Sequence, residues 1–212
     1  SIFKLIPMRR LLTFLGSMLL FVSCRGPQAP PTGDNTKTAT EANPAFAAYE
    51  AYFLNAFWQQ QPEWATQIGF HKFDTLLVIP GDASRKKMLD FVRRQTDSLQ
   101  VFKTQQLNPA QQIDFRLIEN QLAATAWAIN DEKAFEWNPS NYNVTGLIAF
   151  MLTEQYAPLP ERLKACYKRM AAIPAFYEAA KRQLKNPVKE LTQLAIDQNQ
   201  GGLSILEQDL LD

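Results

Sequence analysis

The sequence predicts an all-α fold. Apolar residues recur at helical spacing along most of the chain, and no stretch alternates with period two for long enough to suggest a sheet. Proline, often directly after asparagine, stands where several of these patterns begin, as is typical of helix N-termini. We expect a helical domain over residues 44–212 with six or seven helices, some of them paired as antiparallel hairpins.

The first predicted helix begins at Pro44, is capped by Asn43, and runs to about Gln61. Its apolar residues form a broad stripe that must face a core. A short helical turn is expected over residues 63–68. Residues 70–79 are then expected to be irregular or extended, and Pro80-Gly81 is expected to form a turn.

Two long helices are predicted next, at about residues 82–106 and 109–135. Asp82 is the expected cap of the first, and Asn108 of the second. Gln111 stands three residues after Asn108, as a capping box requires. The connection between the two helices is very short, which predicts an antiparallel hairpin.

The second half of the chain alternates apolar helical segments with turn residues. An asparagine-rich loop is expected at residues 137–143. Helices are predicted at residues 144–156, 161–173 and 174–184, followed by a last helix after Asn186 that the Gly201-Gly202 pair interrupts.

Residues 1–24 are interpreted as upstream sequence followed by a lipoprotein signal. The first methionine is Met8, and two arginines and about a dozen apolar residues follow it. A membrane-spanning helix needs roughly 18 apolar residues, so spanning is the weaker interpretation. The run ends in Leu-Phe-Val-Ser-Cys, which resembles a bacterial lipobox and makes Cys24 the predicted lipidation site. The alternative is an ordinary signal peptide with an incidental cysteine.

Residues 25–43 are predicted to be a flexible tether, because they are rich in proline, threonine and asparagine and lack aromatic and branched aliphatic residues. Without residues 1–24 the chain has 19 basic and 21 acidic residues, a net charge of −2. No basic patch is apparent, so nucleic acid is not an expected partner. We expect export and anchoring to a lipid membrane of the bacterial envelope.

The chain has one histidine, His71, and this limits its chemistry. A zinc-binding H-E-x-x-H motif needs two histidines, so we assign no metal ligand and no catalytic residue. His71 and Asp74 could face a substrate cleft, or could bond backbone groups of their irregular segment, which we favour. The same alternatives apply to Asn138 and Tyr142 in the asparagine-rich loop. Cys166 is expected to be a buried, unreactive thiol.

Four segments, in order, resemble the family of domain of unknown function 885. Residues 62–74 are similar to its P-x-x-A-T-x-x-G-x-H-x-Y-D segment, and residues 107–117 to its L-s-p-x-x-x-x-D-y-x-l-l stretch. Residues 137–143 resemble its W-x-x-[DN]-P-x-x-Y loop. Residues 159–184 resemble its R-L-x-x-x-x-x-R-L-x-x-I-P-x-x-L helix pair. The resemblance extends from about residue 43 to the end of the chain.

The resemblance implies a metallopeptidase-like protein, similar to zinc carboxypeptidases and longer than this chain. An H-E-x-x-H helix and its zinc would lie past Asp212, so we expect a truncated chain that is not catalytic alone. Phe73 stands where the family has tyrosine, which weakens any catalytic role there. The implied partners are a peptide substrate and the missing C-terminal lobe. The alternative is a non-catalytic surface lipoprotein that binds a peptide or protein.

Overall fold

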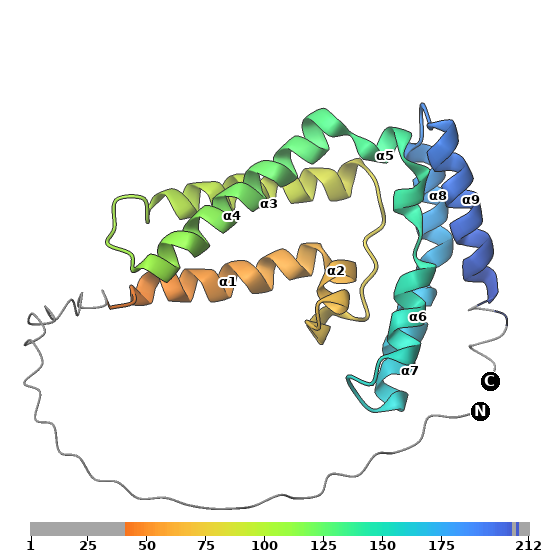
Figure 1. Ribbon diagram of the computed structural model, residues 1–212, viewed down its shortest axis with the longest axis horizontal. Helices are drawn as coiled ribbons and strands as arrows, with labels where there is room; N and C mark the ends of the chain where they lie inside the picture. Colours follow the sequence, from red (N-terminus) through yellow and green to blue (C-terminus); the bar gives the residue numbers. More distant parts are fainter. Residues whose placement is uncertain (1–40, 205–206, 208–212) are drawn as a thin grey trace, which may run out of the picture. The chain divides into compact units, whose positions relative to one another are not determined.

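The computed structural model describes residues 41–204 and residue 207, and every regular element in this part is helical (Figure 1). The all-α prediction is therefore confirmed, although the described residues form nine α-helices and not the six or seven that were expected. The predicted signal, Cys24 and the tether up to residue 40 lie outside the described residues. Within them the elements are α1 (Pro44–Gln60), α2 (Pro62–Gln67), η1 (His71–Phe73), α3 (Asp82–Gln100), α4 (Pro109–Trp127), η2 (Ala128–Glu132), α5 (Ala134–Trp137), η3 (Pro139–Tyr142), α6 (Thr145–Thr153), α7 (Leu159–Met170), α8 (Ile173–Gln183) and α9 (Lys189–Ser204).

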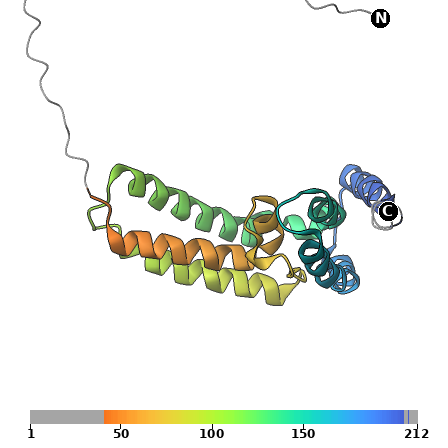
Figure 2. The ribbon, with the colours of Figure 1, turned by 90° about the horizontal axis from the view of Figure 1, so that it is seen from below.

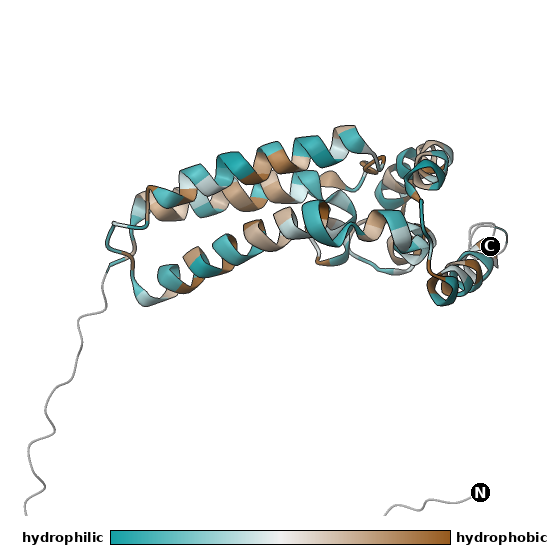
Figure 3. Ribbon diagram, turned by 90° about the horizontal axis from the view of Figure 1, so that it is seen from above, coloured by the Kyte–Doolittle hydropathy of each residue, from teal (hydrophilic) through white to brown (hydrophobic). Residues whose placement is uncertain are grey.

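Helices α1, α3 and α4 enclose the largest core. They lie side by side in both ribbon views, and α3 and α4 form the predicted antiparallel hairpin (Figures 1 and 2). Apolar and polar residues are interspersed along these helices (Figure 3), and the apolar side chains that face inward form the core. The buried residues of this core are Phe46, Phe53, Phe57, Met88, Phe91, Val92, Leu99, Phe102, Leu107, Ile118 and Leu122.

One glutamine joins the starts of α1 and α4. Asn43 caps α1 by accepting hydrogen bonds from Ala45 N and Phe46 N, and Asn108 accepts from Gln111 N at 2.9 Å in a complete capping box. The Gln111 amide also bonds the backbone N–H and C=O of Asn43, at 2.8 and 2.9 Å. Both predicted caps are confirmed, and Gln111 connects them across the core.

Several predicted helix boundaries were wrong. The residue that caps α3 is Gly81, and Asp82 is the first helical residue. Helix α3 ends at Gln100 because the next residues form tight turns that bring Phe102 back into the first core. Helix α4 ends at Trp127, and a π-helical turn follows it. That turn ends at Lys133, which has a left-handed backbone with φ of 51°.

Helix α9 continues through the glycine pair that was expected to interrupt it. The reason is close packing on α6. A Cβ atom at Gly202 would overlap the side chain of Thr145, whereas one at Gly201 would meet no other atom within 4 Å. Gly202 therefore lies where α9 contacts α6. The fold tolerates the cost of about 1 kcal/mol that a glycine adds inside a helix.

Helices α6 to α9 form the second half of the described chain. Helix α6 packs on α7 around Ile148, Met151 and Cys166, and α8 packs on η3 around Tyr142 and Phe176. Helix α9 contacts η3 and α6 (Figure 1). These two cores place α7 against the segment that follows α2, where the candidate site lies.

Candidate functional site

A buried arginine of α7 organises the segment that follows α2. Arg169 is 1% exposed, and its Nε donates to Leu76 O at 2.7 Å. Its Nη2 donates to the carbonyl oxygens of Pro62 and Phe73, each at 3.2 Å, and its Nη1 donates to Thr66 Oγ1 at 3.0 Å. One guanidinium thus bonds three carbonyl groups about a hundred residues earlier in the sequence: at the start of α2, at the end of η1 and in the connector after η1.

Burial lowers the pKa of Arg169, and the nearby carboxylates of Glu63 and Asp74 oppose this effect. A buried cation requires such compensation, because an unpaired charge in a protein interior is costly. The two carboxylates therefore offset part of the cost of burying the arginine charge.

The structure brings His71 and Asp74 together. His71 Nδ1 lies 3.0 Å from Asp74 Oδ2, and Thr66 Oγ1 lies 2.7 Å from Asp74 Oδ1. The His71 side chain is 26% exposed and that of Asp74 is 7% exposed. Because an ionised carboxylate only accepts hydrogen bonds, the tautomer with the proton on Nδ1 fits this contact.

Tyr156 completes this group of residues, which we call the His71 cluster (Thr66, His71, Asp74, Tyr156 and Arg169). Its ring stacks on the His71 imidazole, with centroids 3.6 Å apart and planes within 2°. Burial, and then the neighbouring Asp74 carboxylate, raise the pKa of Tyr156. The Tyr156 hydroxyl is buried, and no hydrogen bond of normal geometry joins it to any described residue.

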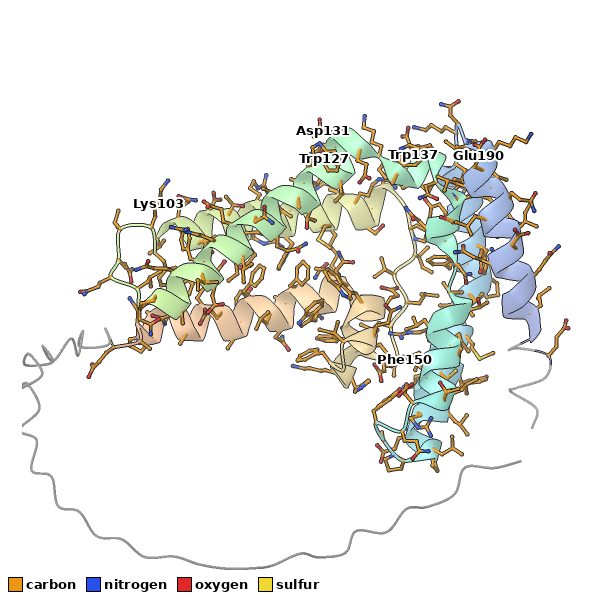
Figure 4. The ribbon with its side chains drawn as sticks, viewed as in Figure 1. Lys103, Trp127, Asp131, Trp137, Phe150 and Glu190 are labelled. Atoms are coloured by element: carbon orange, nitrogen blue, oxygen red, sulfur yellow. The ribbon has the colours of Figure 1, made fainter. Side chains whose placement is uncertain are left out.

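The other two predicted site residues lie elsewhere. Asn138 Oδ1 accepts from Ser140 N at 3.1 Å and Ser140 Oγ at 2.6 Å, which shapes η3. The Tyr142 hydroxyl donates to Phe135 O at 2.7 Å, and the residue is 7% exposed. Trp137, at the end of α5, likewise donates to a backbone carbonyl (Figure 4). Neither Asn138 nor Tyr142 contacts the His71 cluster among the described residues.

A cleft of about 690 Å³ lies beside the same segment. Its walls are the ends of α1 and α4, the start of α3, and residues 76–79. Glu63 lines it and accepts a hydrogen bond from Val78 N at 2.6 Å, and burial raises the pKa of its carboxyl group. Arg85 and Lys87 on α3 add positive charge to the lining. No pattern in the sequence indicates this cleft.

Arg169 was also missed, although a sequence signal for it existed. It lies three residues after Cys166 and seven after Arg162, on the side of α7 that faces the interior. Arg162 is buried too, and donates to the carbonyl groups of Met151, Leu152 and Ala157. Two arginines in line with an apolar stripe indicate buried bonds to backbone carbonyl groups.

The expectation of a buried thiol is confirmed, because Cys166 is 1% exposed and burial raises the pKa of its thiol. In the part of the chain that the structure describes, no three histidine, cysteine or acidic side chains gather as metal ligands. These residues therefore do not fit a zinc site. Across residues 41–204, no helix is both long and apolar enough to cross a bilayer.

The chain resembles one solved structure, described as "a putative lipoprotein of unknown function" from Shewanella oneidensis. The two are 42% identical, with a TM-score of 0.75, over 78% of this chain and 30% of the other. The matched region is thus less than a third of that protein's length. Comparison with curated proteins gives no match. Residues 62–212 match the family described as "Bacterial protein of unknown function (DUF885)", and the chain belongs to this family.

Proposed function

We propose that the helical region forms one wall of the substrate cleft in a larger, envelope-anchored, zinc-dependent peptidase-like protein. In this proposal the zinc ligands come from sequence beyond residue 212, and the described residues bind and orient the peptide. No catalytic step is assigned to the described residues, because they offer no metal site.

The observation that carries the proposal is the fixed orientation of His71. Asp74 holds its Nδ1, and Tyr156 covers one ring face, while Nε2 bonds no described residue. An imidazole that a carboxylate holds through one nitrogen can present the other nitrogen to a ligand in a fixed direction. Arg169 keeps this support rigid, so His71 would meet a substrate without reorganising.

Exposed apolar side chains support the idea of a larger protein. Tyr52, Ile113, Leu117 and Tyr167 are between 60% and 75% exposed. Ile113 and Leu117 lie one turn apart on α4 and form a continuous apolar surface, and such surfaces are typical of faces that pack against another part or partner. The matched region is 30% of the similar lipoprotein, so the rest of that protein is long enough to pack against such a face.

Peptide hydrolysis by the protein from the whole reading frame tests the proposal. We expect His71→Gln to lower kcat/KM by about tenfold or more, because the ring that contacts the substrate is lost. Lys103→Gln, in the exposed α3–α4 connection (Figure 4), is the control and should leave kcat/KM unchanged. Equal kcat/KM values for the His71 variant and the wild-type protein would refute a substrate-contacting role.

The lipid anchor needs its own test. Cys24 is the proposed acylation site, and similarity to a protein described as a lipoprotein supports envelope attachment. Metabolic labelling with a fatty-acid probe should label the wild-type protein and not a Cys24→Ser variant. Labelling of both proteins would place the lipid elsewhere.

A second candidate is a non-catalytic surface lipoprotein that binds a peptide or protein partner. The observation in its favour is a groove of about 480 Å³ between η3, α8 and α9, lined mainly by apolar side chains that include Tyr142, Tyr177 and Ile196. Partner binding by the whole protein, without peptide hydrolysis or bound zinc, would favour this candidate.

A further inference from the structure

The connector between η1 and α3 contains a stretch with strand-like character, residues 76–79, which we call the 76–79 segment. Its sequence is Leu-Leu-Val-Ile, and these residues form no helix, turn or bend. Figure 1 shows the connector as a drawn-out loop between α2 and α3. Val78 and Ile79 are β-branched, and such residues favour β-strands, yet the described residues contain no strand with which the segment pairs.

Hydrogen bonds hold alternate residues of the segment to the body of the protein. Leu76 N donates to Phe73 O at 2.9 Å, and Leu76 O accepts from Arg169 Nε at 2.7 Å. Two residues later, Val78 N donates to Glu63 Oε1 at 2.6 Å. In an extended chain the backbone groups of alternate residues point to the same edge, so this edge is fixed to the protein.

The opposite edge is open. Among the described residues, none makes a hydrogen bond with the backbone of Leu77 or Ile79. On this edge Ile79 is 39% exposed, whereas the Leu77 side chain is partly buried against the core around Tyr142 and Phe176. All four residues of the segment line the 690 Å³ cleft. An accessible edge with unpaired N–H and C=O groups is a template for one more strand.

We propose that the 76–79 segment is a docking strand, on which an extended peptide pairs with the backbone of Leu77 and Ile79 and lies in the cleft. The inference rests on the proposed function for the ligand class, and adds where and how the peptide binds. Strand pairing recognises the backbone of the peptide, so peptides of many different sequences can bind. Glu63, Arg85 and Lys87 place charges of both signs in the lining, where they can meet polar side chains or termini.

Binding of N-methylated peptides tests this pairing. The probe is a fluorescent, capped peptide of alternating valine and alanine, and its anisotropy is measured with the full chain and a chelator that prevents metal-dependent hydrolysis. A matched probe of the same sequence carries an N-methyl group on every residue, so that no register leaves an N–H for the paired edge. Because strand pairing needs these N–H groups, the methylated probe should bind about tenfold more weakly than the parent. Equal binding of the two probes, or no binding of the parent, overturns the inference.

A matched pair of protein variants tests the same edge. Ile79→Pro removes an N–H that no described residue uses, whereas Ile79→Val keeps it and trims the side chain. We expect the proline variant to bind the probe about fivefold or more weakly and the valine variant to bind normally, with unchanged circular dichroism for both. Normal binding by a folded proline variant overturns the docking strand. It leaves the peptidase proposal standing, because hydrolysis by the whole protein is measured separately.

Discussion

Replacing Arg169 with methionine tests whether one side chain holds the segment after α2. Methionine approximates the volume of the arginine stem but donates no hydrogen bond. The carbonyl groups of Leu76, Pro62 and Phe73 then lose a partner, and Asp74 loses a compensating charge. Among the described residues, Leu76 O is left without a hydrogen-bond donor, whereas Pro62 O and Phe73 O keep the bonds from Thr66 Oγ1 and Leu76 N. Removing one partner from a buried group of opposite charges costs about 3–5 kcal/mol, so we expect a loss of that size in the free energy of unfolding.

Urea unfolding followed by circular dichroism measures this loss. Since domains are stable by only about 5–15 kcal/mol, the midpoint should move far toward lower urea. Hydrogen exchange should also show lower protection of residues 62–79 than of α3 and α4. The control is Arg182→Met on the exposed face of α8, which should change stability by less than about 0.5 kcal/mol. A loss below about 1 kcal/mol for the Arg169 variant would refute the reasoning.

Three further predictions follow from single contacts. Gly202→Ala should lower the free energy of unfolding by about 1–3 kcal/mol, because the new Cβ would overlap the Thr145 side chain. Gly201→Ala should leave stability unchanged or raise it. Equal melting temperatures for the two variants would contradict this prediction. Burial raises the pKa of Glu63 above 4.5, so the folded state binds its proton more tightly, and stability from this group falls as pH rises above 4.5. Glu63→Gln should therefore be more stable than wild type at pH 7 and similar near pH 4, and urea titrations that show the reverse order would contradict the assignment. Asn108→Ala should cost about 1 kcal/mol through the lost capping box, and an unchanged midpoint would argue against that cap.

Local signals predicted most of the fold. Asn43 and Asn108 cap the helices they were expected to cap, because side-chain bonds to the first turn depend on only a few neighbouring residues. The short connection between α3 and α4 also predicted their antiparallel hairpin correctly. The errors came where tertiary packing outweighs local propensity: Phe102 ends α3 by turning into the core, and Gly202 stays helical because it contacts α6.

The candidate site was predictable only in part. His71 and Asp74 lie three residues apart, so their contact is local and could be expected from the sequence. Arg169 and Tyr156 reach them from α7 and the α6–α7 connection, and no local pattern gives such a long-range contact. The cleft beside Glu63 likewise depends on how α1, α3 and α4 end near one another.

The sequence of the reading frame beyond the codon for Asp212 tests the central claim most directly, since that claim assigns substrate binding to the described helices and catalysis to later residues. We predict a helix with an H-E-x-x-H motif in that sequence, and zinc in the purified full-length protein. A stop codon soon after Asp212, or a long continuation without any such motif, would contradict the claim and favour a binding lipoprotein.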